Sequence, residues 1–240
     1  MADFGTRSYL ESFEEEFHGK PLGSDSQLWE MNIMTCPSLF RGDVGTFNKA
    51  RQDHPDWIPL MYRWNFRGDE KNPLDLRGAD LRNVDLRGAK FSHVNLAGVS
   101  FVGSLMRTVE FEFCDLQGTD FSGMDFEYGE FHWCNMAGAQ LPGISAPTAS
   151  FYDSNLTGAN LRDADLHLIM RFWNLNLTRA DLRGANLRSD SFRNNEIEGV
   201  QVDAGQALAI FQRQFHELER QLKVISRQLQ GVLKQDVASV

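Results

Sequence analysis

Residues that could support catalysis or metal binding are few in this sequence and lie far apart. The chain has three cysteines and six histidines, and the histidines form no close pair at ligand spacing. It contains no GxSxG element, no P-loop, no HExxH pair and no Rossmann glycine triplet. We therefore predict a protein that is not an enzyme and that carries no cofactor and no metal.

The middle of the chain is organised by a repeat of five residues. From Leu74 it reads LDLRG, ADLRN, VDLRG, AKFSH, VNLAG, VSFVG, with a large apolar residue third in each unit and mostly a small residue first. Units of this kind cover residues 74–204, with a slip of one residue near Ile169. A period of five residues fits neither an α-helix nor a regular β-strand. It fits a chain that turns a corner in every unit, so that four units close one coil and successive coils stack as parallel strands about 4.8 Å apart.

Residues 20 apart should then lie directly above one another. Every fourth unit has phenylalanine at its centre, and the column crosses the slip: Phe91, Phe111, Phe131, Phe151, Phe172 and Phe192. The last position of a neighbouring face is glycine in six of seven coils, the exception being Arg179. Glycine is expected where a corner needs an unusual backbone angle. The sequence thus predicts a ladder of aromatic rings along one inner wall.

The motifs ADLRN, ADLRG and ANLRS resemble the A(D/N)LXX pattern of pentapeptide-repeat proteins. This resemblance implies an all-β solenoid, a right-handed quadrilateral parallel β-helix. The sequence departs from the pattern at 104–106, at 144–147 and around Ile169. A central Ala146 leaves the core thin, and Pro142 and Pro147 each remove a backbone donor, so we expect a local kink or a loosened coil there.

Segments without the repeat flank the solenoid on both sides. Residues 1–73 are interpreted as a mostly helical N-terminal cap, with one amphipathic helix at Tyr9–Phe17 and a second at about Thr46–Gln52. The alternative is that this segment is a separate recognition module. Open solenoid ends invite further strand pairing, which favours the cap.

Residues 205–240 are predicted to form a long C-terminal α-helix. Apolar residues follow one another at alternating spacings of three and four, as in a coiled coil: Leu208, Phe211, Phe215, Leu218, Leu222, Ile225, Leu229 and Val232. This seam predicts a homodimer through the C-terminal helix, which the family resemblance also favours. The alternative is a helix that docks on its own solenoid.

The net charge, the positions of the cysteines and the lack of long apolar runs exclude further kinds of protein. The formal net charge is −9, which argues against direct binding of nucleic acid. Cys114 and Cys134 are 20 apart at inward positions and should be small core residues. The sequence has no apolar run that could span a membrane and no apolar signal core near its start, so we expect a cytoplasmic protein that binds no membrane.

The outer surface carries the most specific functional signal. Between Arg107 and Arg162 no lysine or arginine occurs, whereas eight acidic residues do, so the solenoid has an acidic waist between basic collars. Phe113 and Trp133 are 20 apart on the outside and should stack. Aromatic side chains beside carboxylates are typical of protein-binding surfaces. We therefore predict a partner-binding surface, unless a terminal segment covers it, made of Glu110, Glu112, Phe113, Tyr128, Glu130, His132, Trp133, Tyr152 and Trp173.

Three functions are compatible with this pattern. The first is a non-catalytic protein that presents a rigid acidic and aromatic face to a protein partner. The second follows from the family resemblance, which includes quinolone-resistance (Qnr-type) proteins that are similar to duplex DNA in width and charge and bind DNA gyrase or topoisomerase IV. The third is an adaptor in a larger bacterial or phage assembly.

Overall fold

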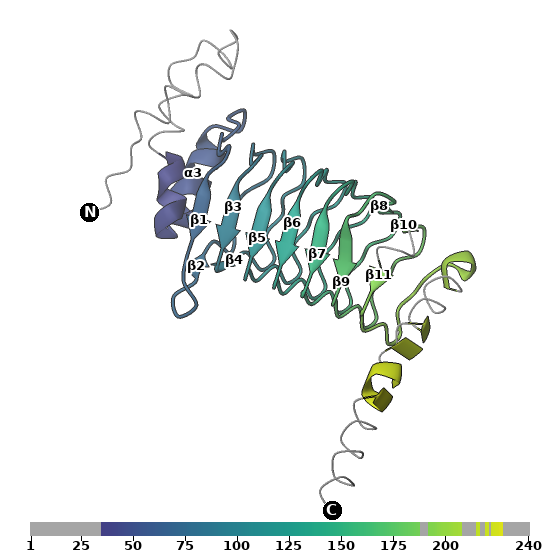
Figure 1. The fold of residues 1–240 in the computed structure, drawn as a ribbon. Helices are drawn as coiled ribbons and strands as arrows, with labels where there is room; N and C mark the ends of the chain where they lie inside the picture. Colours follow the sequence, from purple (N-terminus) through teal and green to yellow (C-terminus); the bar gives the residue numbers. More distant parts are fainter. Residues whose placement is uncertain (1–34, 188–191, 208–214, 217–218, 221, 228–240) are drawn as a thin grey trace, which may run out of the picture.

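The computed structural model describes residues 35–187, 192–207, 215–216, 219–220 and 222–227. It is an all-parallel β-solenoid with a short helical region at one end (Figure 1). The predicted helix at Tyr9–Phe17 lies outside the described residues. Within the described residues the N-terminal region contains the 3-10 helix η1 (Cys36–Arg41) and α3 (Val44–Asp53), so the helix expected at about Thr46–Gln52 is confirmed.

Seven strands from successive coils form the main sheet, in the order β1-β3-β5-β6-β7-β9-β11. Each strand pairs in parallel with the equivalent strand of the next coil, and from β3 to β7 the paired residues are 20 apart, as the period predicts. The strands are β1 (Asn65–Arg67), β3 (Lys90–Ser92), β5 (Glu110–Glu112), β6 (Glu130–His132), β7 (Ser150–Tyr152), β9 (Arg171–Trp173) and β11 (Phe192–Arg193). Two smaller sheets pair β2 (Leu74–Asp75) with β4 (Val94–Asn95) and β8 (Asp165–Leu166) with β10 (Asn186–Leu187).

The core contains the predicted column of phenylalanine rings. Phe91 and Phe111 stack at 4.8 Å between ring centroids, and Phe131 and Phe151 stack at 4.4 Å. The next pair, Phe151 and Phe172, is T-shaped at 6.0 Å. The pairing of β7 with β9 joins Phe151 to Phe172, one position beyond the regular spacing. This register confirms the slip, and the change of ring geometry falls at the same point.

Parallel pairing extends further toward the N-terminus than the predicted first coil. β1 pairs with β3, and Phe66 stacks on Phe91 at 4.7 Å with an angle of 6° between the rings. Phe66 is further from Phe91 along the chain than one regular coil, because the loop around 69–73 interrupts the spacing. Residues 60–67, which the sequence assigns to the flanking segment, therefore pair as part of the solenoid.

The corners use a left-handed backbone more widely than expected. Positive φ was predicted for one glycine-rich column, and Gly118 has a φ of 60°. Other columns also have it at the last position of the unit, where Asn83, Phe113 and Trp133 have φ values of 54°, 52° and 51°. The left-handed angle is thus a property of the corner position and not of glycine alone.

The expected loosening around Ile144–Pro147 is wrong. Backbone hydrogen bonds continue through this region, since Gly123 N–H donates to Pro142 O at 2.9 Å and Ala146 N–H donates to Asp165 O at 3.0 Å. Both prolines are fourth in their units. In regular units the N–H at this position bonds to the side chain of the second residue, as Glu127 N–H does to Asp125 Oδ1 at 3.0 Å. Proline there removes no bond of the ladder, and the register offset lies at 168–170, where the sequence predicts the slip.

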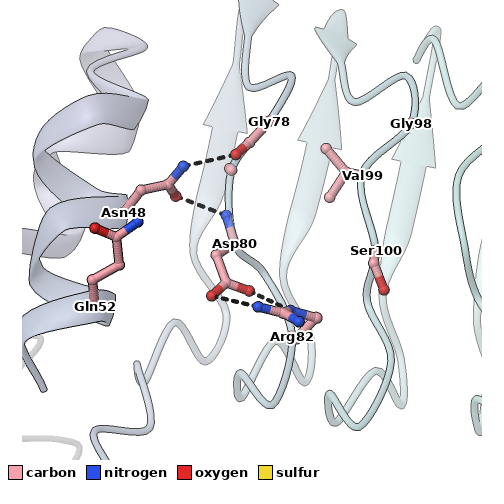
Figure 2. A pocket seen from close by; sticks show the side chains of 9 residues that line it. Asn48, Gln52, Gly78, Asp80, Arg82, Gly98, Val99 and Ser100 are labelled. Atoms are coloured by element: carbon pink, nitrogen blue, oxygen red, sulfur yellow. Dashed lines mark hydrogen bonds and ion pairs between the residues drawn. The ribbon is translucent and has the colours of Figure 1, made fainter. Parts of the chain in front are cut away.

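The N-terminal helix lies against the exposed edge of the first coils. Asn48 on α3 donates from Nδ2 to Gly78 O at 2.8 Å and accepts at Oδ1 from Asp80 N–H at 2.8 Å (Figure 2). Its side-chain amide therefore takes the place of a neighbouring peptide group. Phe47 and Trp57 are fully buried beside it and belong to the same core as the coils.

The C-terminal residues that the structure describes are helical at 204–207, 215–216, 219–220 and 222–227. Of the predicted seam, Phe215, Leu222 and Ile225 are described, and their exposed fractions are 61%, 66% and 50%. The other seam residues lie outside the described residues: Leu208, Phe211, Leu218, Leu229 and Val232.

Candidate functional site

The candidate surface is the outer side of the seven-stranded sheet together with the corner that follows each strand. Along that corner His93, Phe113 and Trp133 form a continuous stack, which we call the corner stack. Its centroid distances are 4.9 Å in both steps, with interplanar angles of 10° and 7°. The predicted stacking of Phe113 on Trp133 is confirmed.

The corner stack stays exposed although its residues are large. Phe113 and Trp133 are each 44% exposed. Both have left-handed backbone angles, which are uncommon for bulky residues and cost free energy unless other contacts compensate. Stacking between the rings offsets part of this cost.

Next to the corner stack, His132 and Tyr152 form a half-buried polar pair. The Tyr152 hydroxyl lies 2.6 Å from His132 Nδ1, and His132 Nε2 lies 3.4 Å from the Glu130 carboxylate. Burial lowers the pKa of His132 despite the neighbouring carboxylates, so the ring is neutral at pH 7 and accepts a hydrogen bond from the phenol at Nδ1.

This pair does not have the properties of an activated nucleophile. Burial and the Glu130 carboxylate raise the pKa of the Tyr152 hydroxyl. A nucleophilic phenol would need a lowered pKa instead. The arrangement therefore favours a fixed recognition surface over covalent chemistry.

At the C-terminal side of the sheet, two arginine side chains lie near the ring of Trp173. The guanidinium of Arg193 lies 5.2 Å from the centre of the Trp173 ring, and that of Arg171 lies 5.8 Å from it. Arg171 is also 5.7 Å from the Tyr152 ring. These cation–π contacts were not foreseen from the sequence, although the spacing of 20 between Trp173 and Arg193 beyond the slip could have indicated one of them.

The predicted partner-binding residues do not all lie together. His132, Trp133 and Tyr152 are in mutual ring contact. Tyr128 comes before β6 instead of after it, so this 56% exposed ring lies at the opposite corner of the sheet. Glu110 pairs with Lys90 at 2.7 Å, whereas Glu112 and Glu130 remain on the surface beside the aromatic residues.

An open groove of about 680 Å³ begins at Trp133 and follows the corner toward the C-terminal coils. Amide side chains dominate its lining and bond to one another from coil to coil. Asn174 Nδ2 donates to Asp153 Oδ1 at 2.9 Å, and Asn194 Nδ2 donates to Asn174 Oδ1 at 2.7 Å. The lining contains no lysine or arginine and consists of Trp133, Asp153, Ser154, Asn155, Asn174, Leu175, Asn176, Asn194, Asn195 and Glu196.

A second groove of about 340 Å³ lies between α3 and the first coils (Figure 2). Its polar groups already bond to one another. Asn48 bonds to the backbone at Gly78 and Asp80, and the Asp80 carboxylate pairs with Arg82 at 2.7 Å. This groove is therefore a structural junction.

The cysteines are placed as the sequence predicts. Cys114 and Cys134 are free and 2% exposed. Burial raises the pKa of Cys134 and of Cys36, so these thiols are unreactive core groups. Among the residues that the structure describes, no cluster of three histidine, cysteine or acidic side chains could hold a metal ion.

In the described ranges, each helix is too short or too polar to pass through a bilayer.

Comparison with known proteins identifies the repeat. The family model of pentapeptide repeats matches in eight copies, at residues 75–107, 109–143 and 130–167. No curated protein sequence matches the chain.

Several solved structures are similar to the chain. QnrB1, a plasmid-mediated fluoroquinolone resistance protein, is 19% identical over 64% of this chain and 84% of its own, with a TM-score of 0.33. A pentapeptide repeat protein from the Arabidopsis thaliana thylakoid lumen is 30% identical over 46% of this chain and 71% of its own, with a TM-score of 0.24. HetL from Nostoc sp. strain PCC 7120, involved in heterocyst differentiation regulation, is 15% identical over 64% and 91%, with a TM-score of 0.25.

Proposed function

The chain contains a pentapeptide-repeat region, and from this premise we propose that it is a non-catalytic binding protein. Its rigid solenoid presents the outer side of the main sheet, with the corner stack, to a protein partner. The observation that carries this proposal is the pair Phe113–Trp133, two large rings held 44% exposed at backbone angles that disfavour them. Large exposed aromatic rings beside carboxylates are typical of protein-binding surfaces.

Affinity capture from the organism's own lysate tests this proposal. The wild-type chain is expected to retain a stoichiometric protein partner, and the variant Trp133→Ala with Glu130→Lys is expected to lose it, because both the aromatic and the acidic contact are removed. A matched control, Leu105→Ala with Asp125→Lys, changes an exposed apolar and an acidic residue outside the main sheet. Equal capture by all three folded chains would contradict the proposal, as would capture of nothing by the wild type.

A second candidate function is DNA mimicry toward DNA gyrase or topoisomerase IV. Several arginines at the two ends of the repeat region are paired with aspartates of their own units, as Arg77 is with Asp75 at 2.7 Å and Arg183 with Asp181 at 2.6 Å. Their charge is thus partly neutralised, and the acidic residues between Arg107 and Arg162 would be attracted to a basic DNA-binding groove. A gyrase supercoiling assay with the purified chain distinguishes this candidate, since neither inhibition nor protection at micromolar protein would exclude it.

We further propose a right-handed, four-sided coil, closed at its N-terminal end by residues 35–59 of the predicted cap, and a homodimer through the C-terminal helix. The Asn48 contacts and the buried Phe47 and Trp57 support the cap. The exposed seam residues Leu222 and Ile225 support the dimer. Light scattering should return twice the chain mass of 27.3 kDa for the wild type and the monomer mass for Leu222→Lys with Ile225→Lys. A wild-type monomer at all concentrations would contradict the dimer.

A further inference from the structure

The two faces of the Trp133 ring differ. One face stacks on Phe113 of the preceding coil, with a centroid distance of 4.9 Å and an angle of 7° between the planes. The stack runs from coil to coil, so the other face is directed toward the corner residue of the next coil. That residue is Asp153, whose short side chain cannot cover an indole ring. The Tyr152 ring of the next coil contacts Trp133 edge-on at 5.7 Å between centroids, and Trp133 remains 44% exposed in the lining of the groove, so the corner stack ends with a partly open aromatic face beside Asp153.

Acidic groups accompany this open face. Asp153 and Glu196 are the charged residues of the groove, and both are exposed. Asp153 Oδ1 accepts the hydrogen bond of the Asn174 amide at 2.9 Å. Within the described part of the chain, no cation pairs with the Asp153 carboxylate. A negative charge beside an exposed indole face is suited to a cation.

The neighbouring outer column, on the strands of the main sheet, contains a tryptophan with a guanidinium over its ring. Trp173 and Arg193 are paired residues on adjacent strands, and the guanidinium lies 5.2 Å from the indole centre. The spacing between adjacent coils therefore allows a guanidinium to lie over a tryptophan of the preceding coil. Next to Trp133, the corner residue of the following coil is Asp153 and not a cation.

We propose that the groove at Trp133 binds an arginine side chain of the protein partner. The guanidinium stacks on the open face of Trp133, and its N–H edge donates to the Asp153 carboxylate. Arginine fits better than lysine because its planar group can stack and donate two parallel hydrogen bonds at once. This inference rests on the proposed function and specifies the chemistry that the partner brings to this surface.

Binding of a small arginine analogue to the intact protein tests the groove directly. The probe is N-acetyl-arginine methylamide, and the measurement is the indole N–H resonance of Trp133 in nitrogen–proton correlation spectra, assigned with Trp133→Phe. We expect a saturable shift of this resonance and a much smaller shift of the Trp173 resonance, because that ring is already covered by Arg193. The citrulline analogue, which has the same shape without the charge, should produce no saturable shift.

The variant Asp153→Asn isolates the role of the carboxylate. Asparagine tolerates the left-handed angle of this position, where φ is 52°, so the fold should be retained. The affinity for the arginine analogue should fall about tenfold because a charge-assisted pair is lost. Unchanged affinity in Asp153→Asn, an equal response to citrulline, or a response to a neutral disaccharide in place of arginine would each overturn the proposal.

Partner capture separates a failure of this inference from a failure of the proposed function. Loss of the partner in Trp133→Ala but not in Asp153→Asn would overturn the arginine site and leave the binding surface intact. Binding of the arginine analogue together with capture that is unaffected by Trp133→Ala would instead contradict the proposed function and retain the site.

Discussion

Two aromatic columns run in parallel along the solenoid and differ in nearly every property except their period. The inner column, from Phe66 to Phe192, lies in extended strands, and its rings are at most 1% exposed. The corner stack of His93, Phe113 and Trp133 lies one corner away, at left-handed backbone positions, with its larger rings 44% exposed. The same ring stacking is therefore buried in one column and exposed in the other.

This difference shows which aromatic residues the fold needs. Burying a phenylalanine removes a large apolar area from water and stabilises the coil. An exposed ring at a strained corner gains only the stacking contribution, which is about 0.5–1.5 kcal/mol. We therefore expect the fold to depend far less on the corner stack than on the inner column, which supports the proposal that the stack binds a partner.

The largest effect expected from this comparison is the loss of an inner ring. Phe131→Ala should lower the free energy of unfolding by about 3–5 kcal/mol because it leaves a cavity between rings. Phe113→Ala, the matched change in the corner stack, should cost about 1 kcal/mol or less. Urea unfolding followed by circular dichroism measures both values, and similar costs would contradict the distinction between the two columns.

A smaller effect should isolate the backbone from the side chain at a corner. Gly138 has a φ of 67°, and a Cβ added there would meet no atom within 4 Å, so Gly138→Ala tests conformational strain alone. It should cost about 1 kcal/mol. Arg179, at the equivalent corner with a φ of 59°, should give a gain of similar size when changed to glycine. Thermal melting measures both, and changes of the same sign would contradict the assignment of strain to the corner.

The smallest expected effect is a pH dependence at the polar pair beside the corner stack. Burial lowers the pKa of His132 below its ordinary value of about 6.5, so protonation favours the unfolded chain. The contribution of His132 to stability is present above about pH 6.5 and is lost as the pH falls toward the lowered pKa. The difference in unfolding free energy between the wild type and His132→Gln should therefore shrink between pH 7.5 and 5.5. A difference that stays constant or grows on acidification would contradict this sign.

Periodicity alone predicted much of this arrangement. It placed Phe91, Phe111 and Phe131 in one column and Phe113 against Trp133, because in a solenoid the neighbour of a residue is fixed by counting. Periodicity failed to predict the position of Phe66. The loop at 69–73 lies between Phe66 and its neighbour Phe91, so these two residues do not have the regular spacing.

Features that depend on where a side chain or an N–H group points could not be predicted from residue spacing. The pattern gave no reason to expect that proline is harmless fourth in a unit, because this depends on which N–H groups join the ladder. It placed Tyr128 near Trp133 in number, whereas the strand β6 separates the two corners in space. The different surroundings of the two faces of Trp133 likewise became apparent only from the ring contacts.

The offset between β7 and β9 has a consequence for how such a chain can change in length. Since paired residues from β3 to β7 are 20 apart, which is four units of five, deletion of 20 residues would shorten the rod and leave every later face aligned with the earlier ones. Deletion of a single unit would turn all later coils by one side and separate columns that now belong together. One additional residue, as at 168–170, is absorbed as a local bulge, and the columns resume beyond it. Small insertions are therefore tolerated by this architecture, whereas partial coils are not.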